Sequence, residues 1–243
     1  MSLECITGWL RRTADLNQAG RDAWVLAKAR SVLPGSTVLD VGAGTGRYRS
    51  YFAHCRYHAQ DLAAYTGTAA GPQADRWSYT RLDFISTADC LPLRMGMFDA
   101  VLCTEVLEHV PQPIAVLGEI GRILRPGGRL FLTAPLGSGL HQQPYHYYGG
   151  YTPHFYQRFL PEAGLRIIAV EPNGGFFRHF GQEVARAGHI LSYRPGRPWW
   201  HPVRLAAMVT TGLIAPTVFA RLDDVIFVEE FTVGYHVEAV RAG

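Results

Sequence analysis

One segment, Thr37–Tyr48 (TVLDVGAGTGRY), limits the possible folds of this chain more than any other. Its first five residues form a short, mostly apolar run, which is typical of a β-strand covered on both faces. Glycines follow at positions 42, 44 and 46, where they allow a sharp turn and a close approach of the backbone to a ligand. The segment therefore predicts a buried strand, a ligand-binding turn and then a helix starting near Arg47, with its N-terminal amides toward the ligand.

The glycine spacing and the residue before the turn indicate the kind of ligand. In the glycine fingerprint that binds dinucleotides, a third glycine would stand at Arg47, where it lets helix and strand pack closely over a pyrophosphate. Here the third glycine, Gly46, comes one residue earlier. Asp40, at the end of the strand, would repel a pyrophosphate but could attract an ammonium group. The turn therefore favours a zwitterionic, amino-acid-like ligand.

At these residues the sequence resembles motif I of the class I S-adenosylmethionine-dependent methyltransferases, with VLDVGAGTG as a close match. Residues 122–128, RILRPGG, resemble the family a second time and follow in the right order. The resemblance covers residues 35–171 well and the final strand more loosely. It implies an α/β fold, a Rossmann-like seven-stranded and mostly parallel sheet with helices on both faces and an antiparallel last strand. It also implies S-adenosyl-L-methionine as cofactor.

Length and composition suit such a protein. The chain has 243 residues, of which 18% are charged and 48% apolar, as expected for one folded domain with an insertion. The net charge of +3, without a long basic run, disfavours dedicated nucleic-acid binding. The four cysteines form no CxxC pair, and no apolar stretch follows Arg11 and Arg12. A cytoplasmic protein with reduced thiols and no signal peptide is therefore expected.

We expect a single methyltransferase domain, 1–243, in four parts: an N-terminal helical flank (1–34), a cofactor-binding core (35–171), an insertion (172–228) and a final strand (229–243). Periodicity and turn residues predict the individual elements. The predicted helices cover 9–33, 113–124 and 152–164, and the further strands cover 57–62, 79–84, 98–104, 130–134, 165–171 and 229–241, with a loop over 63–77.

Two aspartates, Asp61 and Asp83, end the second and third predicted strands. A carboxylate at Asp61 can accept from both hydroxyls of a ribose, although it could instead cap the next turn. The resemblance implies that Asp83 meets the adenine amino group and that Phe84 packs near the ring. The cofactor site expected from the turn and the resemblance comprises Asp40, Gly42, Ala43, Gly44, Gly46, Asp61, Leu62, Asp83, Phe84, Thr104 and Glu105.

The segment 105–110, EVLEHV, follows the fourth strand at its carboxyl end, where open α/β sheets build their sites. On one helical turn, Glu105, Glu108 and His109 would share a face, and with His146 they could hold a divalent metal. The segment resembles catechol and polyprenyl-benzoquinone O-methyltransferases and small-RNA 3′-end methyltransferases, in which such a trio binds a metal. Many methyltransferases with EVLEH bind none there, so the metal stays open.

Residues 135–161 are dense in histidine and tyrosine and poor in charge, which is typical of a substrate wall. The segment leaves the fifth strand at its carboxyl end, so we expect it over the bound methyl donor. His141 and His146 are candidate general bases, while some histidines here are expected to be structural. The catalytic candidates are His146, His109, Glu108 and His141.

The insertion 172–228 departs from the family, which usually joins the last two strands by a short connection. Within it, residues 205–220 have no charged side chain, and Arg204 and Arg221 flank them. This stretch is shorter than the roughly 20 residues that cross a bilayer. The tryptophans at 199 and 200 suit an interfacial membrane anchor, and a lid over the substrate or a homodimer contact is an alternative. A peripheral membrane or dimer contact would involve 196–221.

The expected activity is methyl transfer to oxygen on a small or lipid-linked molecule. The Asn/Asp-Pro-Pro-Tyr/Phe signature of exocyclic-amine methylation is absent after strand four, where Thr104 and Glu105 stand instead. One alternative is an RNA-end methyltransferase with a metal-dependent site. Another is a non-catalytic protein that binds S-adenosylmethionine.

Overall fold

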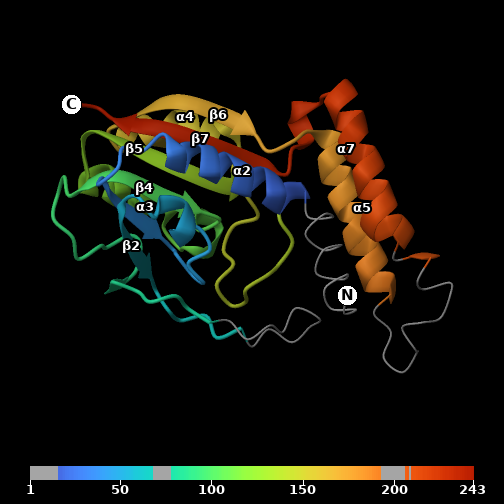
Figure 1. The fold of residues 1–243 in the computed structure, drawn as a ribbon, viewed down its shortest axis with the longest axis horizontal. Coiled ribbons are helices and arrows are strands. Elements are labelled where there is room, and N and C mark those ends of the chain that lie inside the picture. Colours follow the sequence, from blue (N-terminus) through green and yellow to red (C-terminus); the bar gives the residue numbers. More distant parts are fainter. Residues whose placement is uncertain (1–15, 68–77, 193–205, 208) are drawn as a thin grey trace. The chain divides into compact units, whose positions relative to one another are not determined.

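The computed structural model describes residues 16–67, 78–192, 206–207 and 209–243. Its chain divides into two compact units. One consists of 24–171 and 234–243 and holds nearly the whole sheet, and the other contains the described part of 172–233 with the start of the first helix. Figure 1 labels the elements of both.

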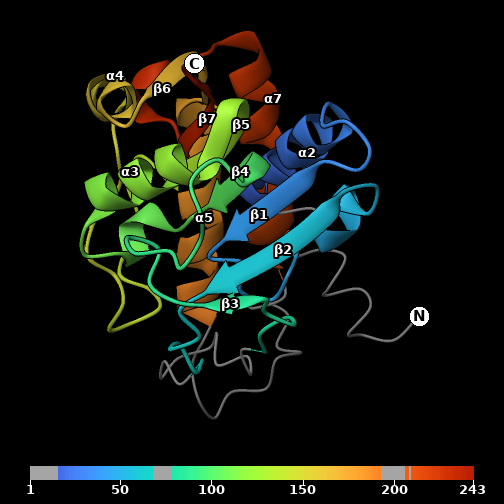
Figure 2. The same ribbon diagram turned by 90° about the vertical axis from the view of Figure 1, so that its left-hand side faces the viewer.

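A seven-stranded sheet forms the first unit, with the strand order β3-β2-β1-β4-β5-β7-β6. Strand β1 pairs in parallel with β2 and β4, and β7 runs antiparallel to β5, between β5 and β6. Figure 2 shows β3, β2 and β1 side by side. The expected fold class is confirmed. The strands are β1 (Thr37–Val41), β2 (Arg56–Asp61), β3 (Phe84–Ile85), β4 (Phe98–Thr104), β5 (Leu124–Pro135), β6 (Leu165–Pro172) and β7 (Gly234–Arg241).

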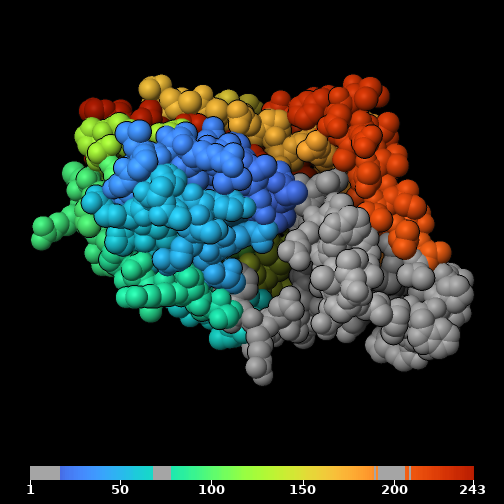
Figure 3. All heavy atoms as spheres, in the orientation of Figure 1, coloured from blue at the N-terminus to red at the C-terminus, as the bar shows by residue number. Residues whose placement is uncertain are grey.

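Helices cover both faces of this sheet because successive strand residues point to opposite sides. Leu39 of β1 packs in one core with the helices α3 (Pro113–Ile123) and α4 (Pro153–Glu162). Val38, its neighbour, packs in a second core with α2 (Leu16–Arg30) and the short 3₁₀-helix η1 (Arg49–Phe52). In Figure 3 the blue atoms of α2 lie directly against the cyan atoms around residue 50. Both faces of the central strands are therefore buried.

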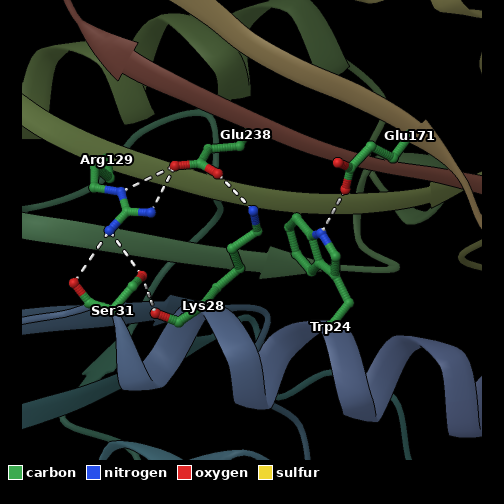
Figure 4. Close-up of polar contacts among 6 residues, drawn as sticks. All are labelled: Trp24, Lys28, Ser31, Arg129, Glu171 and Glu238. Carbon is green, nitrogen blue, oxygen red and sulfur yellow. Dashed lines mark hydrogen bonds and ion pairs between the residues drawn. The ribbon is translucent and has the colours of Figure 1, made fainter.

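Polar contacts fix the C-terminal half of α2 on the sheet (Figure 4). Lys28 donates to Glu238 of β7 over 2.6 Å, and the Arg129 guanidinium of β5 binds the other oxygen of that carboxylate at 2.6 Å. The indole of Trp24 donates to Glu171 of β6 over 3.2 Å. One buried carboxylate thus joins α2 to β5 and β7.

The segment after the glycine turn differs from the expected helix near Arg47. It forms only η1, with hydrogen bonds from Tyr51 to the Tyr48 carbonyl and from Cys55 to the Phe52 carbonyl, three residues back. The sequence here is rich in aromatic side chains of modest helix propensity, and Tyr48 and Phe52 are buried in the core. Burial of these rings and the early start of β2 explain the shorter element.

Strand β3 is also shorter than the predicted 79–84, because residues before it bond elsewhere. The backbone amide of Thr80 donates to the Gly44 carbonyl, and the Tyr79 hydroxyl contacts the backbone of Tyr65. Only Phe84 and Ile85 pair with β2. The segment expected to extend the sheet instead packs against the glycine turn.

Other boundaries shift as well. The helix predicted over 9–33 ends at Arg30, and Leu33 beyond it is 73% exposed. Residues 9–15 lie outside the described part. Strand β5 starts at Leu124, directly after α3, with a register shift where RPGG passes β4. The helix predicted over 152–164 begins one residue later, at Pro153, and Thr152 before it makes no side-chain capping hydrogen bond. Strand β7 begins only at Gly234 because 229–231 form a 3₁₀-helix, η4 (Glu229–Phe231).

The second unit contains two packed helical segments within 172–228. Helix α5 (Phe176–Ser192) packs against α7 (Ala215–Val225) and the π-helix η3 (Thr210–Ile214), as Figure 1 shows. Gly188 faces Thr211 so closely that an added Cβ would lie 1.8 Å from its hydroxyl oxygen. The buried Asp223 carboxylate of α7 accepts backbone hydrogen bonds from Gly175 and Phe177 at the start of α5. Among the described residues, every helix is too short or too polar to cross a bilayer.

Candidate functional site

The glycine turn has the backbone that its sequence predicts. All three glycines adopt positive φ, at +69° for Gly42, +50° for Gly44 and +71° for Gly46. A Cβ on Gly42 would lie 2.4 Å from a methyl group of Val106, and one on Gly46 would lie 2.6 Å from the hydroxyl oxygen of Thr80. Side chains larger than hydrogen are therefore excluded at these two positions by both conformation and packing.

Hydrogen bonds from β2 hold the turn in place. The Asp61 carboxylate accepts from the backbone amides of Gly44 and Ala63, each over 2.9 Å. Gln60, which is 1% exposed, accepts from the Gly42 amide through its side chain at 3.4 Å, and its carbonyl accepts from Ala43. Sequence reasoning missed Gln60, since a glutamine inside a strand gives no local signal. Each Asp61 oxygen keeps a second lone pair for a ribose hydroxyl.

Replacing Asp61 with alanine is expected to weaken binding of S-adenosylmethionine by about 1.5–3 kcal/mol, as for the loss of a charge-assisted hydrogen-bond pair. The dissociation constant from calorimetry measures this. Asp224→Ala, at an exposed position of α7, is the matched control and should bind as the wild type. An unchanged constant for Asp61→Ala would remove this residue from the site.

The other expected cofactor residues lie at the carboxyl ends of β2 and β4 and at the start of β3. Asp83 accepts from the backbone amide of Ala59 over 2.9 Å, which ties the start of β3 to β2. The ring of Phe84 lies 6.0 Å from that of His58 between centroids. Leu62 follows Asp61 with 46% of its side chain exposed, as expected for a residue that would cover a ligand. Thr104 ends β4 and pairs with β5.

Asp40 is buried, with 2% exposure, and accepts a hydrogen bond from the hydroxyl of Tyr57. Burial raises the pKa of Asp40 to about 7, although the Tyr57 hydrogen bond opposes this rise, and the nearby Asp61 adds to it. The residue expected to meet the ammonium group is therefore close to its titration midpoint at neutral pH.

The helical turn expected for EVLEHV is not formed. Glu105 adopts a left-handed backbone, with φ at +52°, and accepts a hydrogen bond from the Thr133 hydroxyl over 2.8 Å. A 3₁₀-helix, η2 (Leu107–His109), begins two residues later. Glu105 therefore does not share a helical face with Glu108 and His109, because its side chain is bound to β5 instead.

A different group of three comes together. One ligand atom from each of Glu108, His109 and His141 lies within 4.8 Å of the others. Glu108 is 1% exposed, and its Oε1 lies 3.9 Å from Nε2 of His109. His141 therefore belongs to this group, whereas the sequence predicted Glu105 and His146 as the partners of Glu108 and His109.

The environment of His109 fixes its protonation. Its Nδ1 lies 2.5 Å from the Tyr145 carbonyl oxygen, to which it donates, so Nε2 bears the lone pair. That Nε2 is buried and has no hydrogen-bond partner within the described parts of the chain. Burial lowers the pKa of His109 to about 4, despite the Tyr145 contact, and the histidines at 141 and 146 lower it further. His109 is a neutral imidazole across the physiological range.

His146 lies beside this group. Its ring centroid is 4.5 Å from that of His141 and 5.7 Å from that of His109. Its Nε2 is 3.1 Å from the Ser138 hydroxyl. Burial, and secondarily His141, lower the pKa of His146. The structure therefore brings all four catalytic candidates together, with His146 at the rim.

The aromatic loop 136–152 is folded onto η2. The backbone amide of Tyr147 donates to the Glu108 carbonyl over 2.8 Å, and the hydroxyl of Tyr151 donates to the Leu107 carbonyl over 2.6 Å. Val106, immediately before η2, touches Gly42 of the glycine turn. The acid and histidine cluster is thus joined directly to the expected cofactor loop.

Comparison with known proteins identifies a domain that includes the glycine turn and η2. Residues 39–132 match the family described as "Methyltransferase domain". A ubiquinone biosynthesis O-methyltransferase of Xanthomonas campestris pv. campestris (strain B100) is 39% identical over 109 residues, 43% of this chain and 45% of the relative. One of the same description from Xanthomonas axonopodis pv. citri (strain 306) is 29% identical over 201 residues, 78% of this chain and 79% of the relative. The chain thus spans less than half of the first relative's length.

A solved structure shares the fold. Phosphoethanolamine N-methyltransferase 2 of Haemonchus contortus, in complex with S-adenosyl-L-methionine, superposes with a TM-score of 0.54 at 15% identity, over 92% of this chain and 52% of its own. At this identity the likeness concerns the fold alone. The strand order, the glycine turn and the methyltransferase domain matched over residues 39–132 agree with the resemblance to class I S-adenosylmethionine-dependent methyltransferases.

Proposed function

We propose that this protein transfers the methyl group of S-adenosylmethionine to an oxygen atom of a small or lipid-linked molecule. The observation that carries the proposal is the cluster of Glu108, His109 and His141, which adjoins the cofactor turn through Val106. An acceptor hydroxyl in this place would face both the methyl donor and groups that can take up its proton. The names of the two Xanthomonas relatives support the same acceptor atom.

On the donor side the protein mainly binds and orients. The sulfonium is already activated, so alignment of methyl group and nucleophile, with exclusion of water, supplies most of the catalysis. Asp61 holds the ribose, Asp83 the adenine amino group, and Asp40 the ammonium group. The glycine turn, braced by Gln60 and Thr80, lets the backbone approach the methionine part.

On the acceptor side a hydroxyl must lose its proton. His146 and His141 are placed to receive it, since their rings lie within 4.5 Å of one another beside Glu108 and His109. The aromatic residues of the loop 136–152 form the wall against which an apolar acceptor packs. Glu105, bound to Thr133, holds the end of β4 in position.

The same cluster fits a divalent cation. Glu108, His109 and His141 offer one carboxylate oxygen and two imidazole nitrogens, and the buried Nε2 of His109 has the lone pair of a ligand. A cation held there would favour the deprotonated form of the acceptor hydroxyl. This set replaces the expected Glu105, Glu108, His109 and His146. With His141 as a ligand, His146 would receive the acceptor proton.

Removal of divalent cations is expected to reduce methyl transfer by at least about tenfold, as observed when metal-site groups are lost. Dialysis against a chelator, followed by return of zinc or manganese, tests this. The metal content of the purified protein and the change in its melting temperature on chelation give a readout that does not depend on turnover. If the chelator changes neither transfer nor melting and no metal is found, the three residues act in positioning and proton transfer alone.

The surface of the insertion 172–228 favours a lipid-linked acceptor. Helix α7, continuing from η3, exposes a row of apolar side chains with helical spacing: Ile214, Val218, Leu222 and Val225. The sequence from 184 to 222 contains five arginines and no acidic residue. Such a surface suits peripheral contact with a lipid membrane, where a cytoplasmic enzyme could reach a lipid-linked acceptor. It overlaps the expected contact segment 196–221, of which residues 196–205 and 208 lie outside the described part of the chain. A homodimer contact through the same helix is the alternative.

Methyl transfer from labelled S-adenosylmethionine into an extract of the host, split into lipid, small-molecule and RNA fractions, tests the proposal. Label in the lipid fraction supports a lipid-linked acceptor and the membrane role of α7, and label among small molecules supports a soluble acceptor. Label in RNA would overturn the proposal in favour of the RNA-end alternative. Cofactor binding without label in any fraction would indicate a non-catalytic protein.

A further inference from the structure

Asp40 is not isolated at the base of the glycine turn. Tyr57, on the neighbouring strand β2, donates its hydroxyl to the Asp40 carboxylate. The guanidinium of Arg49, from η1, lies over the Tyr57 ring at 4.7 Å from its centroid and is held by the Arg81 carbonyl at 2.9 Å. The ring of Phe52 packs against Tyr57 at 6.1 Å. Arg49, Tyr57 and Asp40 thus form a connected row, which we call the Asp40 row.

The Asp40 row lies beside a surface hollow. A cavity of about 500 Å³ is lined by residues of η1 together with Gly46, Cys55 and Tyr57. It adjoins η1, which stands where a full helix was expected after the glycine turn. Solvent can therefore approach Arg49 and Tyr57 from this side, while Asp40 behind them stays 2% exposed.

Charged and titratable groups from three elements surround Asp40. Arg49 of η1 is positive and stabilises its ionised form. From β2, the Tyr57 hydroxyl also stabilises the ionised form, whereas the charge of Asp61 destabilises it. Cys103 of β4 is neutral, since burial above all raises the pKa of its thiol. Burial and Asp61 therefore favour the protonated form of Asp40, whereas Tyr57 and Arg49 favour its ionised form.

We propose that Tyr57, with Arg49 over its ring, is a positioning residue that orients the Asp40 carboxylate for the ammonium group of S-adenosylmethionine and favours its ionised form. The inference rests on the cofactor and not on the acceptor or its chemistry. Binding experiments therefore test it separately from methyl transfer. S-adenosylhomocysteine, which keeps the ammonium group, is the probe.

Proton linkage predicts how the affinity for S-adenosylhomocysteine changes with pH. Burial raises the pKa of Asp40 to about 7, so below that pH the free protein holds a proton there that must leave when the ammonium group binds. The amino group of the probe is that of a free amino acid, beside a carboxylate, so it stays protonated throughout this pH range. Affinity is therefore expected to rise about 25-fold between pH 5.5 and 7.5.

Tyr57→Phe removes a hydrogen bond that favours the charged form, so the midpoint of this rise should move to higher pH. At pH 6.5 the variant should bind the probe about 3- to 10-fold more weakly than the wild type, and the difference should shrink toward pH 8. Tyr51→Phe, on η1 with its ring 5.8 Å from that of Tyr48, is the matched control and should follow the wild-type profile.

Calorimetry of the probe at several pH values, in buffers of different ionisation enthalpy, measures both affinity and proton release. The expected result is release of roughly three-quarters of a proton at pH 6.5 in the wild type, and none in Asp40→Asn. A merely structural role of Tyr57 would lower affinity by the same factor at every pH. That outcome, or a wild-type affinity independent of pH with no proton released, would overturn the inference.

Discussion

Replacing Gly42 with alanine is expected to weaken cofactor binding by at least about 30-fold, or roughly 2 kcal/mol or more. Gly42 has a φ of +69°, where an L side chain is strained, and its Cβ would lie 2.4 Å from a methyl group of Val106. Because Val106 is buried, the turn must move to accommodate the methyl group. The binding constant of S-adenosylhomocysteine and the melting temperature together measure the effect.

Gly137→Ala provides the matched control, since Gly137 has open space around its Cβ position and no positive φ. It should bind the cofactor as the wild type. Adding Val106→Ala to Gly42→Ala should restore part of the affinity, because it relieves the collision but not the backbone strain. Wild-type affinity for Gly42→Ala alone would mean that this turn does not hold the cofactor.

His109→Ala is expected to reduce methyl transfer by at least about 10²-fold while cofactor binding stays within a factor of two or so. The change removes the buried lone pair at Nε2 and the contact that fixes the Tyr145 carbonyl. Both lie on the proposed acceptor side of the site, whereas the residues proposed to hold the ribose and the adenine, Asp61 and Asp83, lie on β2 and directly before β3. Initial rates at saturating cofactor, together with calorimetry, separate the two effects.

His154→Ala is the control for this substitution. His154 lies on the exposed side of α4, where its ring contacts Gln157, and takes no part in the cluster. It should retain full activity. Glu108→Gln, which keeps the side-chain shape and removes the charge, should lose activity as His109→Ala does. Equal activity of all three variants would place the chemistry elsewhere in the protein.

Much of the fold could be predicted because its signals are local. The apolar run 98–104 predicted β4 with correct ends. The glycines at 42, 44 and 46 predicted the turn, because a residue without a side chain adopts positive φ without strain. The helix over 113–124 appears as α3, although Ile114 on its apolar face is 47% exposed. Fold class follows from the order of such elements.

The contacts within the site could not be predicted in the same way, because they join residues far apart in the sequence. Glu105 was expected beside Glu108, but Thr133 of β5 binds its side chain. His141 and not His146 joins Glu108 and His109, since the path of the loop 136–152 is set by backbone hydrogen bonds to η2. The sequence around Tyr57 and Gln60 does not predict their contacts with Asp40 and Gly42, because these contacts arise only when β2 pairs with β1.

The proposed methylation of oxygen is tested most directly by the chemical form of the transferred methyl group. Labelled product from the host extract would be treated with hydriodic acid, which cleaves methyl ethers and releases the label as volatile methyl iodide. We expect the label in the volatile fraction for the wild type and no labelled product for His109→Ala. Label that stays in the non-volatile residue, as for a methyl group on nitrogen or carbon, would contradict oxygen methylation.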